Sequence, residues 1–519
     1  MGSPGDSSDT LITPFSPTHT PSQTPAMNTV SAGSEPEPEP EPELELSAVE
    51  PAPPIVPKLL REASDITWQD SLDSNKDQVV LIRRHGRFRL LHQQQFRNSL
   101  LASVGYLELA NAGDFAANVW NEIPVPTFAA VLMGIGGTLA LGMVLVAIQD
   151  FRLSWRNVTL LRAEREHIKR LRQHHNKNPE LVQLMNSRLG VSYREIGTEV
   201  VDRIVMDLLM GAGSVLVGVG TLMAIGGANP RVYKASNLLS GYIGNALAAF
   251  FGVVNAVWSI CLIRRFQQHD NAARASQPSD DIRRRLHTRV RRFQWHSFIN
   301  GLNGLVAGAG SMVTAERWWG YIVLIPCIIS LIMCNYFWRK KLGYDRPILD
   351  EISISRVQLT PLLEDLEYAI AMQRALAEPD RSHPHGPFQV HSLESILQFI
   401  MRNRMLEIYC DSLVQDKKTR SLLQDIPAST NVPQQITISH DVLLRLATVQ
   451  PSHLQTLTEH AGKFLRTEGV RVFTHRERHL LELLGYAVWL DQTAATMTPM
   501  TSTAKTEAPA ATTELKNNI

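Results

Sequence analysis

Five long segments without a single charged residue dominate the middle of this chain of 519 residues. They cover residues 125–149, 208–230, 235–263, 297–315 and 318–338. A helix needs about 20 apolar residues to cross the hydrocarbon core of a bilayer, and each segment is about that long. The sequence therefore predicts an all-α fold, a multi-pass transmembrane helical bundle with a cytosolic α-helical C-terminal domain.

A sixth segment, residues 98–120, is less apolar and carries four polar side chains, Glu108, Asn111, Asp114 and Asn118. Their spacing of three, three and four residues places them on one face of a helix. Three interpretations are open: a sixth span whose polar face looks into the bundle, an amphipathic helix lying in the membrane interface, or an ordinary soluble helix. In the first, these four residues form a candidate intramembrane polar path.

Positive charge indicates which loops face the cytosol. Residues 150–207 carry eleven Lys and Arg residues and residues 264–292 carry nine, and Arg339, Lys340 and Lys341 follow the last apolar segment. Five spans would leave the arginines near residues 83–97 outside, whereas six spans keep them inside. We therefore expect six, although two acids at membrane depth cost about 2.5–3.5 kcal/mol each if central.

The chain divides by composition. Residues 1–57 contain no Lys or Arg and are rich in Ser, Thr, Pro and Glu, which is typical of a disordered arm. We expect five parts: this acidic arm, a short basic cytosolic segment at 58–97, the bundle at 98–342, a cytosolic helical domain at 343–493 and a disordered tail at 494–519.

Three stretches within these parts have patterns that predict their local secondary structure. Residues 78–91 fit a small hairpin or a broken helix. The basic loop at 150–207 fits a short coiled-coil arm, a helix on anionic lipid, or a solvated helix that extends a span. In the C-terminal domain, two pairs fit the capping box that marks a helix start, Ser452 with Gln455 and Thr474 with Glu477.

Small residues recur every fourth position in two of the apolar segments, at Gly244, Ala248 and Gly252, and at Gly304 and Gly308. This spacing lets helix backbones approach closely in lipid. It predicts helix packing within the chain, and a homo-oligomer face is the alternative. Four asparagines of these segments are expected to form hydrogen bonds between helices, namely Asn245, Asn255, Asn300 and Asn303.

No pattern in the sequence indicates catalysis, a cofactor or a metal. The glycine-rich stretches lack the Lys-Ser or Lys-Thr of a phosphate-binding loop, and they lie in apolar segments. His475 and His479 have metal-ligand spacing, but a zincin helix would have Glu where this chain has Arg476. We expect a protein that is not an enzyme and does not bind nucleic acid, because no soluble part carries a basic stripe.

The overall build resembles uncharacterised multi-pass membrane proteins of filamentous fungi, with a Ser/Thr/Pro/Glu arm, a small bundle with Arg-rich inner loops and a helical tail. The resemblance covers the whole chain and implies no activity. We expect a membrane anchor, scaffold or accessory factor that binds cytosolic proteins through its helical regions. The alternative is a small-solute channel or transporter whose path the 98–120 helix lines.

The organelle is constrained only by the leader. No apolar signal region follows Met1, and an acidic leader without arginine is unlike a mitochondrial presequence. We therefore expect an endomembrane or the plasma membrane in preference to mitochondria, with the C-terminus in the cytosol.

Overall fold

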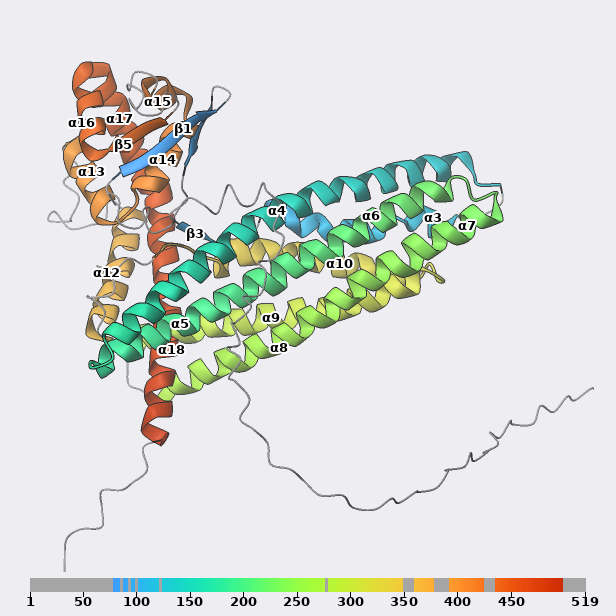
Figure 1. The fold of residues 1–519 in the computed structure, drawn as a ribbon, viewed down its shortest axis with the longest axis horizontal. Coiled ribbons are helices and arrows are strands. Elements are labelled where there is room, and N and C mark those ends of the chain that lie inside the picture. The colour runs from blue at the N-terminus through green and yellow to red at the C-terminus, as the bar shows by residue number, and fades with distance from the viewer. Residues whose placement is uncertain are drawn as a thin grey trace, which may run out of the picture. The chain divides into compact units, whose positions relative to one another are not determined.

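The computed structural model describes residues 78–84, 87–91, 95–98, 101–120, 124–275, 279–348, 359–377, 392–423 and 435–497. The predicted acidic arm and the tail beyond residue 497 lie outside the described residues. The described part is mostly helical, as the sequence predicts (Figure 1).

Four helical stretches are long and apolar enough to cross a membrane. They are α4 (Thr127–His174), the run of α5 (Pro179–Glu199), η2 (Val200–Val205) and α6 (Met206–Ala224), the run of α7 (Pro230–Ser236), η3 (Asn237–Gly244) and α8 (Asn245–Ala275), and α10 (Gly320–Phe337) with η4 (Trp338–Leu342). These four are compatible with a membrane location. The fifth predicted apolar segment lies in α9 (Asp280–Thr314), which packs along α8. Asn300 and Asn303 lower the mean hydropathy of that segment.

The basic loop predicted at 150–207 is a helical hairpin that continues two bundle helices. The last turns of α4 pack against α5 through Ile168, Leu171, Met185 and Leu189. This hairpin matches the predicted extension of a span, and its two helices also cover each other. We call this end of the bundle the basic end, and we call the end with turns 225–229 and 315–319 the opposite end.

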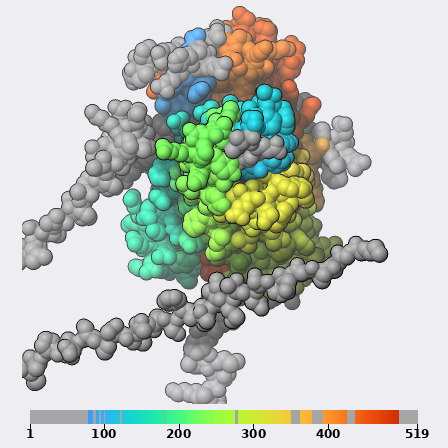
Figure 2. Space-filling model, turned by 90° about the vertical axis from the view of Figure 1, so that its right-hand side faces the viewer, coloured from blue at the N-terminus to red at the C-terminus, as the bar shows by residue number. Residues whose placement is uncertain are grey.

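Residues 98–120 run between these two ends. The Asn98 carbonyl accepts a hydrogen bond from Trp338 Nε1 at 3.3 Å, at the basic end. Ala116 packs with Met133 and Ala224 at the opposite end. Figure 2 faces the opposite end, where cyan, green and yellow residues of the bundle lie next to one another.

The backbone of this segment is not the regular α-helix that the spacing suggested. It consists of the 3-10 helix η1 (Ala102–Ala112) and the short helix α3 (Phe115–Val119). A 3-10 helix is narrower than an α-helix and rises about 2.0 Å per residue. The narrow form suits a tight position between α4, α6 and α10: the Gly113 carbonyl lies so close to Gly136 that no side chain fits there.

Two small antiparallel sheets join the N-terminal and C-terminal parts of the chain. One has the order β2-β1-β5, from β1 (Gln78–Arg84), β2 (Arg87–Leu90) and β5 (Gln435–Ser439). The other pairs β3 (Gln95–Arg97) with β4 (Asp345–Pro347). Residues 78–91 form the predicted hairpin rather than a broken helix, but no pattern in the sequence indicated these long-range pairings.

The C-terminal helices are α12 (Leu359–Ala377), α13 (Leu393–Arg402), α14 (Leu406–Gln415), α15 (Lys417–Leu422), α16 (His440–Val449), α17 (Pro451–Phe464), η6 (Leu465–Gly469) and α18 (Val470–Met497). They are not separate from the bundle, because α18 packs on α5, α8 and α9 within one hydrophobic core. Both predicted capping boxes are wrong. Helix α17 already begins at Pro451, and Thr474 lies inside α18, which η6 joins to α17 without a break.

Candidate functional site

A cavity of about 90 Å³, lined by both apolar and polar side chains, lies inside the bundle between η1, η2, α8, α9 and α10. It has room for a small cluster of water molecules or one small solute. Its polar lining comes from six stretches of the chain and comprises Asn98, Glu108, Thr198, Asp202, Arg203, Asn255, His296, Asn300 and Asn335. Four of these side chains are ionisable. Ionisable residues at membrane depth generally mark functional sites, so this cavity is the first candidate.

The structure separates the four residues of the predicted polar path. Glu108 lines the cavity. Asp114 is fully buried and accepts a hydrogen bond from the Tyr321 hydroxyl at 2.8 Å. Asn118 donates to that hydroxyl at 2.8 Å and to the Asp114 carboxylate at 3.0 Å. The side chain of Asn111 lies outside what the structure describes. Asp114 and Asn118 therefore belong to a hydrogen-bonded cluster away from the cavity.

The small residues of the predicted packing stripes lie where helices approach most closely. Gly252 and Gly304 face each other across α8 and α9, and Gly308 lies against Ala249. Gly244 lies against Val217 of α6, and Ala248 is buried in a cluster with residues of α4, α6 and η1. All five are thus engaged within the chain.

The asparagines between the same helices form reciprocal contacts. Asn300 Nδ2 donates to Asn255 Oδ1 at 3.0 Å, and Asn255 Nδ2 donates to the Asn300 carbonyl at 3.2 Å. Asn245 donates to the Gly241 carbonyl, and Asn303 donates to Ser330 on α10. The two residues that line the cavity, Asn255 and Asn300, are therefore already held by each other.

A cluster of acids adjoins the cavity at the basic end. Arg203 on η2 donates to Asp150 on α4 through Nε and Nη2, and through Nη1 to Glu199 at 2.9 Å. Asn157 donates to Glu199 at 3.2 Å. Asp207 begins the next turn, is 4% exposed and faces Asp150. Three carboxyl groups thus surround one guanidinium group.

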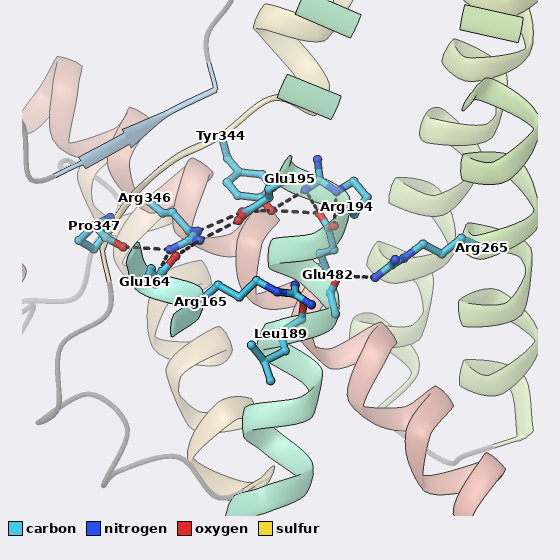
Figure 3. Close-up of polar contacts among 11 residues, drawn as sticks. Glu164, Arg165, Leu189, Arg194, Glu195, Arg265, Tyr344, Arg346, Pro347 and Glu482 are labelled. Carbon is cyan, nitrogen blue, oxygen red and sulfur yellow. Dashed lines mark hydrogen bonds and ion pairs between the residues drawn. The ribbon is translucent and has the colours of Figure 1, made fainter. Parts of the chain in front are cut away.

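A second polar cluster, the network, joins the bundle to the C-terminal helices (Figure 3). Arg346 on β4 forms paired hydrogen bonds with Glu164 and Glu195, with distances of 2.7–3.0 Å. Arg194 on α5 binds both oxygens of Glu482 on α18 at 2.7 and 2.9 Å. Each of these side chains is at most 5% exposed. The network therefore ties β4 and α18 to α4 and α5.

Tyr344 and Arg289 complete the network. The Tyr344 hydroxyl accepts from Arg194 Nη2 at 2.7 Å and lies 2.9 Å from Glu195 Oε1. Arg289 on α9 lies 3.5 Å from Glu482. Burial acts to raise the pKa of Glu482, but the guanidinium groups of Arg194 and Arg289 outweigh it, so this pKa lies below its ordinary value. The ion pairs join three guanidinium groups to three carboxylates.

The two histidines with metal-ligand spacing lie beside this network. His475 Nδ1 accepts a hydrogen bond from the Asp345 backbone N–H at 3.1 Å. Burial, helped by Arg478, lowers the pKa of His475 to about 3, and burial also lowers the pKa of His479 well below its ordinary value. Both rings are therefore neutral at physiological pH. The described residues contain no group of three or more His, Cys, Asp or Glu side chains placed to hold a metal.

Sequence reasoning missed Asp150, Asp202, Arg203 and Asp207, because all four lie in the stretch assigned to a basic cytosolic loop. A signal was present at the boundaries. Asp150 follows the apolar segment 125–149 directly, and Asp207 directly precedes the segment 208–230. An acid directly beside each of two apolar segments is the pattern that could have indicated the cluster.

The chain was compared with protein-family models, with curated proteins and with solved structures, and it matches none of them. The function is therefore inferred from three features of its structure: the cavity, the acid cluster beside it and the network that joins the C-terminal helices to the bundle.

Proposed function

We propose that the chain crosses the membrane six times and that both ends of the bundle sequence lie in the cytosol. The sheets support an even number of crossings, because paired strands lie on the same side of a bilayer. β3 ends at Arg97 and pairs with β4, which begins at Asp345. The apolar parts of α4, α6, α8, α9 and α10 account for five crossings, so residues 98–120 make the sixth.

The dimensions of that segment support the same count. At about 2.0 Å per residue for η1 and about 1.5 Å for α3, the two helices together cover close to the ~30 Å of a bilayer core. Tyr106, Leu109 and Phe115 on this segment are exposed, which suits a surface in contact with lipid. The Lys- and Arg-rich basic end then faces the cytosol, in line with the positive-inside rule.

Within this topology, the protein acts as a non-enzymatic membrane scaffold whose cytosolic helices bind a protein partner. The observation that carries this proposal is the network. It fixes α18 and β4 onto the cytosolic ends of α4, α5 and α9 through paired, buried hydrogen bonds. A helical domain mounted in this way presents the same surface at a constant orientation to the membrane.

The candidate partner surface is the corner between α16 and α17. Val449 and Leu454 are 66% and 47% exposed there, two of the three large exposed hydrophobic side chains that we find among the described residues from 359 onward. A partner that covers this corner would remove both from water, at about 25 cal/mol per Å² of apolar area.

The test replaces both side chains in the full-length protein by Val449→Asp and Leu454→Asp. Ser452→Asp is the matched control, because it adds a charge to the same corner without removing apolar surface. Chemical cross-linking in intact membranes, followed by mass spectrometry, measures which proteins lie against α16 and α17. The double variant should lose cross-links that the control keeps, while thermal unfolding stays unchanged. Identical cross-links in both variants would count against a partner at this corner.

The cavity favours a second candidate, a channel or transporter for a small solute. Its specific support is Glu108, which lines the cavity from the sixth proposed span. Proteoliposomes challenged with glycerol, urea or potassium chloride would reveal a flux by light scattering. Glu108→Gln should then reduce it at least tenfold, whereas Asp114→Asn should reduce it little, because Asp114 lies outside the cavity. Liposomes without any flux would leave the scaffold as the better proposal.

A further inference from the structure

Arg203 does not donate a hydrogen bond to Asp207. Its Nε and Nη2 atoms donate to Asp150, and its Nη1 atom donates to both oxygens of Glu199. Arg203 lies four residues from Glu199 and from Asp207, so a helical side chain could pair with either. In the π-helical turn η2 it pairs with Glu199.

Asp207 is left without a donor. It is 4% exposed, and neither of its carboxylate oxygens receives an N–H or O–H hydrogen bond from the described residues. It lies within hydrogen-bonding reach of Asp150, which is fully buried. Two carboxyl groups therefore face each other with almost none of their surface exposed to water.

Charge makes this arrangement untenable if every acid is ionised. Asp150, Glu199 and Asp207 would carry three negative charges against the single positive charge of Arg203. An unpaired buried carboxylate costs several kcal/mol, and two carboxylates in contact repel each other. The other ionisable groups near the site do not offset this negative charge. They are Asp202 on the same helix, Glu108 on η1 and His296 on α9, all of which line the adjoining cavity.

The geometry points to a proton-binding site: Asp207 holds a proton and donates it in a hydrogen bond to the Asp150 carboxylate at the basic end of the bundle. The proton turns one oxygen into a donor, so that Asp207 gains the hydrogen bond that it lacks. A proton fits better than a metal ion, because no group of three or more ligating side chains is placed around one in the described part of the chain. Arg203, which donates to Asp150, also lines the adjoining cavity, which has room for water.

Removal of the proton has a structural consequence. An ionised Asp207 would compete with Glu199 for Arg203, since both lie four residues from it on the same helix. Once Arg203 releases it, the Glu199 carboxylate would either keep the hydrogen bond from Asn157 or be hydrated instead. Protonation of the pair thus decides which acid Arg203 holds. This inference does not depend on the scaffold proposal, because it concerns only the bundle.

The test uses Asp207→Asn in the purified full-length protein, since an amide has nearly the shape of a protonated carboxyl group. Infrared spectroscopy at neutral pH should show one fewer protonated carboxyl per chain in this variant than in the wild type. Asp150→Asn should lose the same band, because the hydrogen bond that holds the proton needs both carboxyl groups. Asp441→Asn, on an exposed side chain, is the control and should change nothing.

Equilibrium unfolding against pH gives the second readout. The folded pair binds a proton that the unfolded chain has released, so wild-type stability falls as pH rises through the titration of the pair. The ratio of wild-type to Asp207→Asn unfolding constants should grow by up to tenfold per pH unit between the pKa of an unfolded carboxyl group and that of the folded pair, and then level off. Parallel pH profiles, together with an unchanged carboxyl band in both variants, would overturn the inference. A band absent from the wild type, with stability that depends on sodium, would overturn it equally.

Discussion

Two buried charge clusters of this molecule differ in their balance. In the network, Arg194, Arg289 and Arg346 pair with Glu164, Glu195 and Glu482, and Arg188 and Arg265 lie nearby, so every carboxylate has at least one guanidinium group. In the cluster around Arg203, one guanidinium meets three carboxyl groups. Both include residues of the same helical run, α5–η2–α6, on which Glu195 of the network lies about one turn before Glu199 of the Arg203 cluster.

The difference in charge balance suits the two clusters to different roles. Buried ion pairs with matched charges hold segments in one arrangement, but removing one partner leaves an uncompensated charge. A cluster with excess acid must bind a proton or a cation, so its charge depends on conditions. The balanced network accordingly suits a fixed mount for the cytosolic helices, and the acid-rich cluster suits a site that responds to protons.

The loss of one arginine from the network should have the largest effect on stability. Arg346→Met removes the paired hydrogen bonds that hold Glu164 and Glu195, and we expect the free energy of opening α4 and α5 around these acids to fall by about 3–5 kcal/mol. Hydrogen exchange of the α4 and α5 amides near these acids measures this quantity. Arg283→Met is the matched control, because Arg283 pairs with Asp280 at an exposed site and should contribute about 0–1 kcal/mol. Equal effects of the two substitutions would refute a structural role for the network.

The second prediction concerns pH, with opposite signs for the two clusters. His475 and His479 have pKa values below the ordinary value of about 6.5, so the unfolded chain binds more protons below that pH. The region beside the network should lose about 2–3 kcal/mol between pH 7.5 and 5.5. Hydrogen exchange at both pH values measures it, and His475→Gln should roughly halve the loss. The Asp150–Asp207 pair should instead lose stability as pH rises.

The smallest effect tests a polar group that belongs to neither cluster. Tyr321→Phe removes the hydroxyl that donates to Asp114 and accepts from Asn118. We expect thermal unfolding in detergent to report a loss of about 1–2 kcal/mol, because the buried acid loses a donor. Tyr336→Phe, on an exposed tyrosine, should be neutral. A larger loss than for Arg346→Met would mean that the network is not the main polar constraint.

Local patterns in the sequence were enough to predict the helices, since uncharged runs of about 20 residues have few alternatives. Four of them lie in helices of membrane-crossing length. The strand pairings could not be predicted in this way. Phe96 meets Arg346, and Val79 meets Ile438, across hundreds of residues and with strands of only three to seven residues.

The candidate sites were predictable only in part, for a related reason. Helical spacing grouped Glu108 with Asp114 and Asn118, but the switch from η1 to α3 at Gly113 sends Glu108 to the cavity and the other two to Tyr321. Asp150 and Asp207 are 57 positions apart and become neighbours only because α4 and α6 pack together. Single-sequence spacing carries no information about such contacts.

The most direct test of the six-span topology is the side of the membrane on which the N-terminus lies. An acceptor glycosylation tag at the N-terminus should remain unmodified in cells, and the same tag inserted in turn 225–229 should be glycosylated. This result would place residues 98–120 across the membrane and allow β1 to pair with β5. A glycosylated N-terminal tag would contradict the account, because five spans would put β1 and β5 on opposite sides of the bilayer.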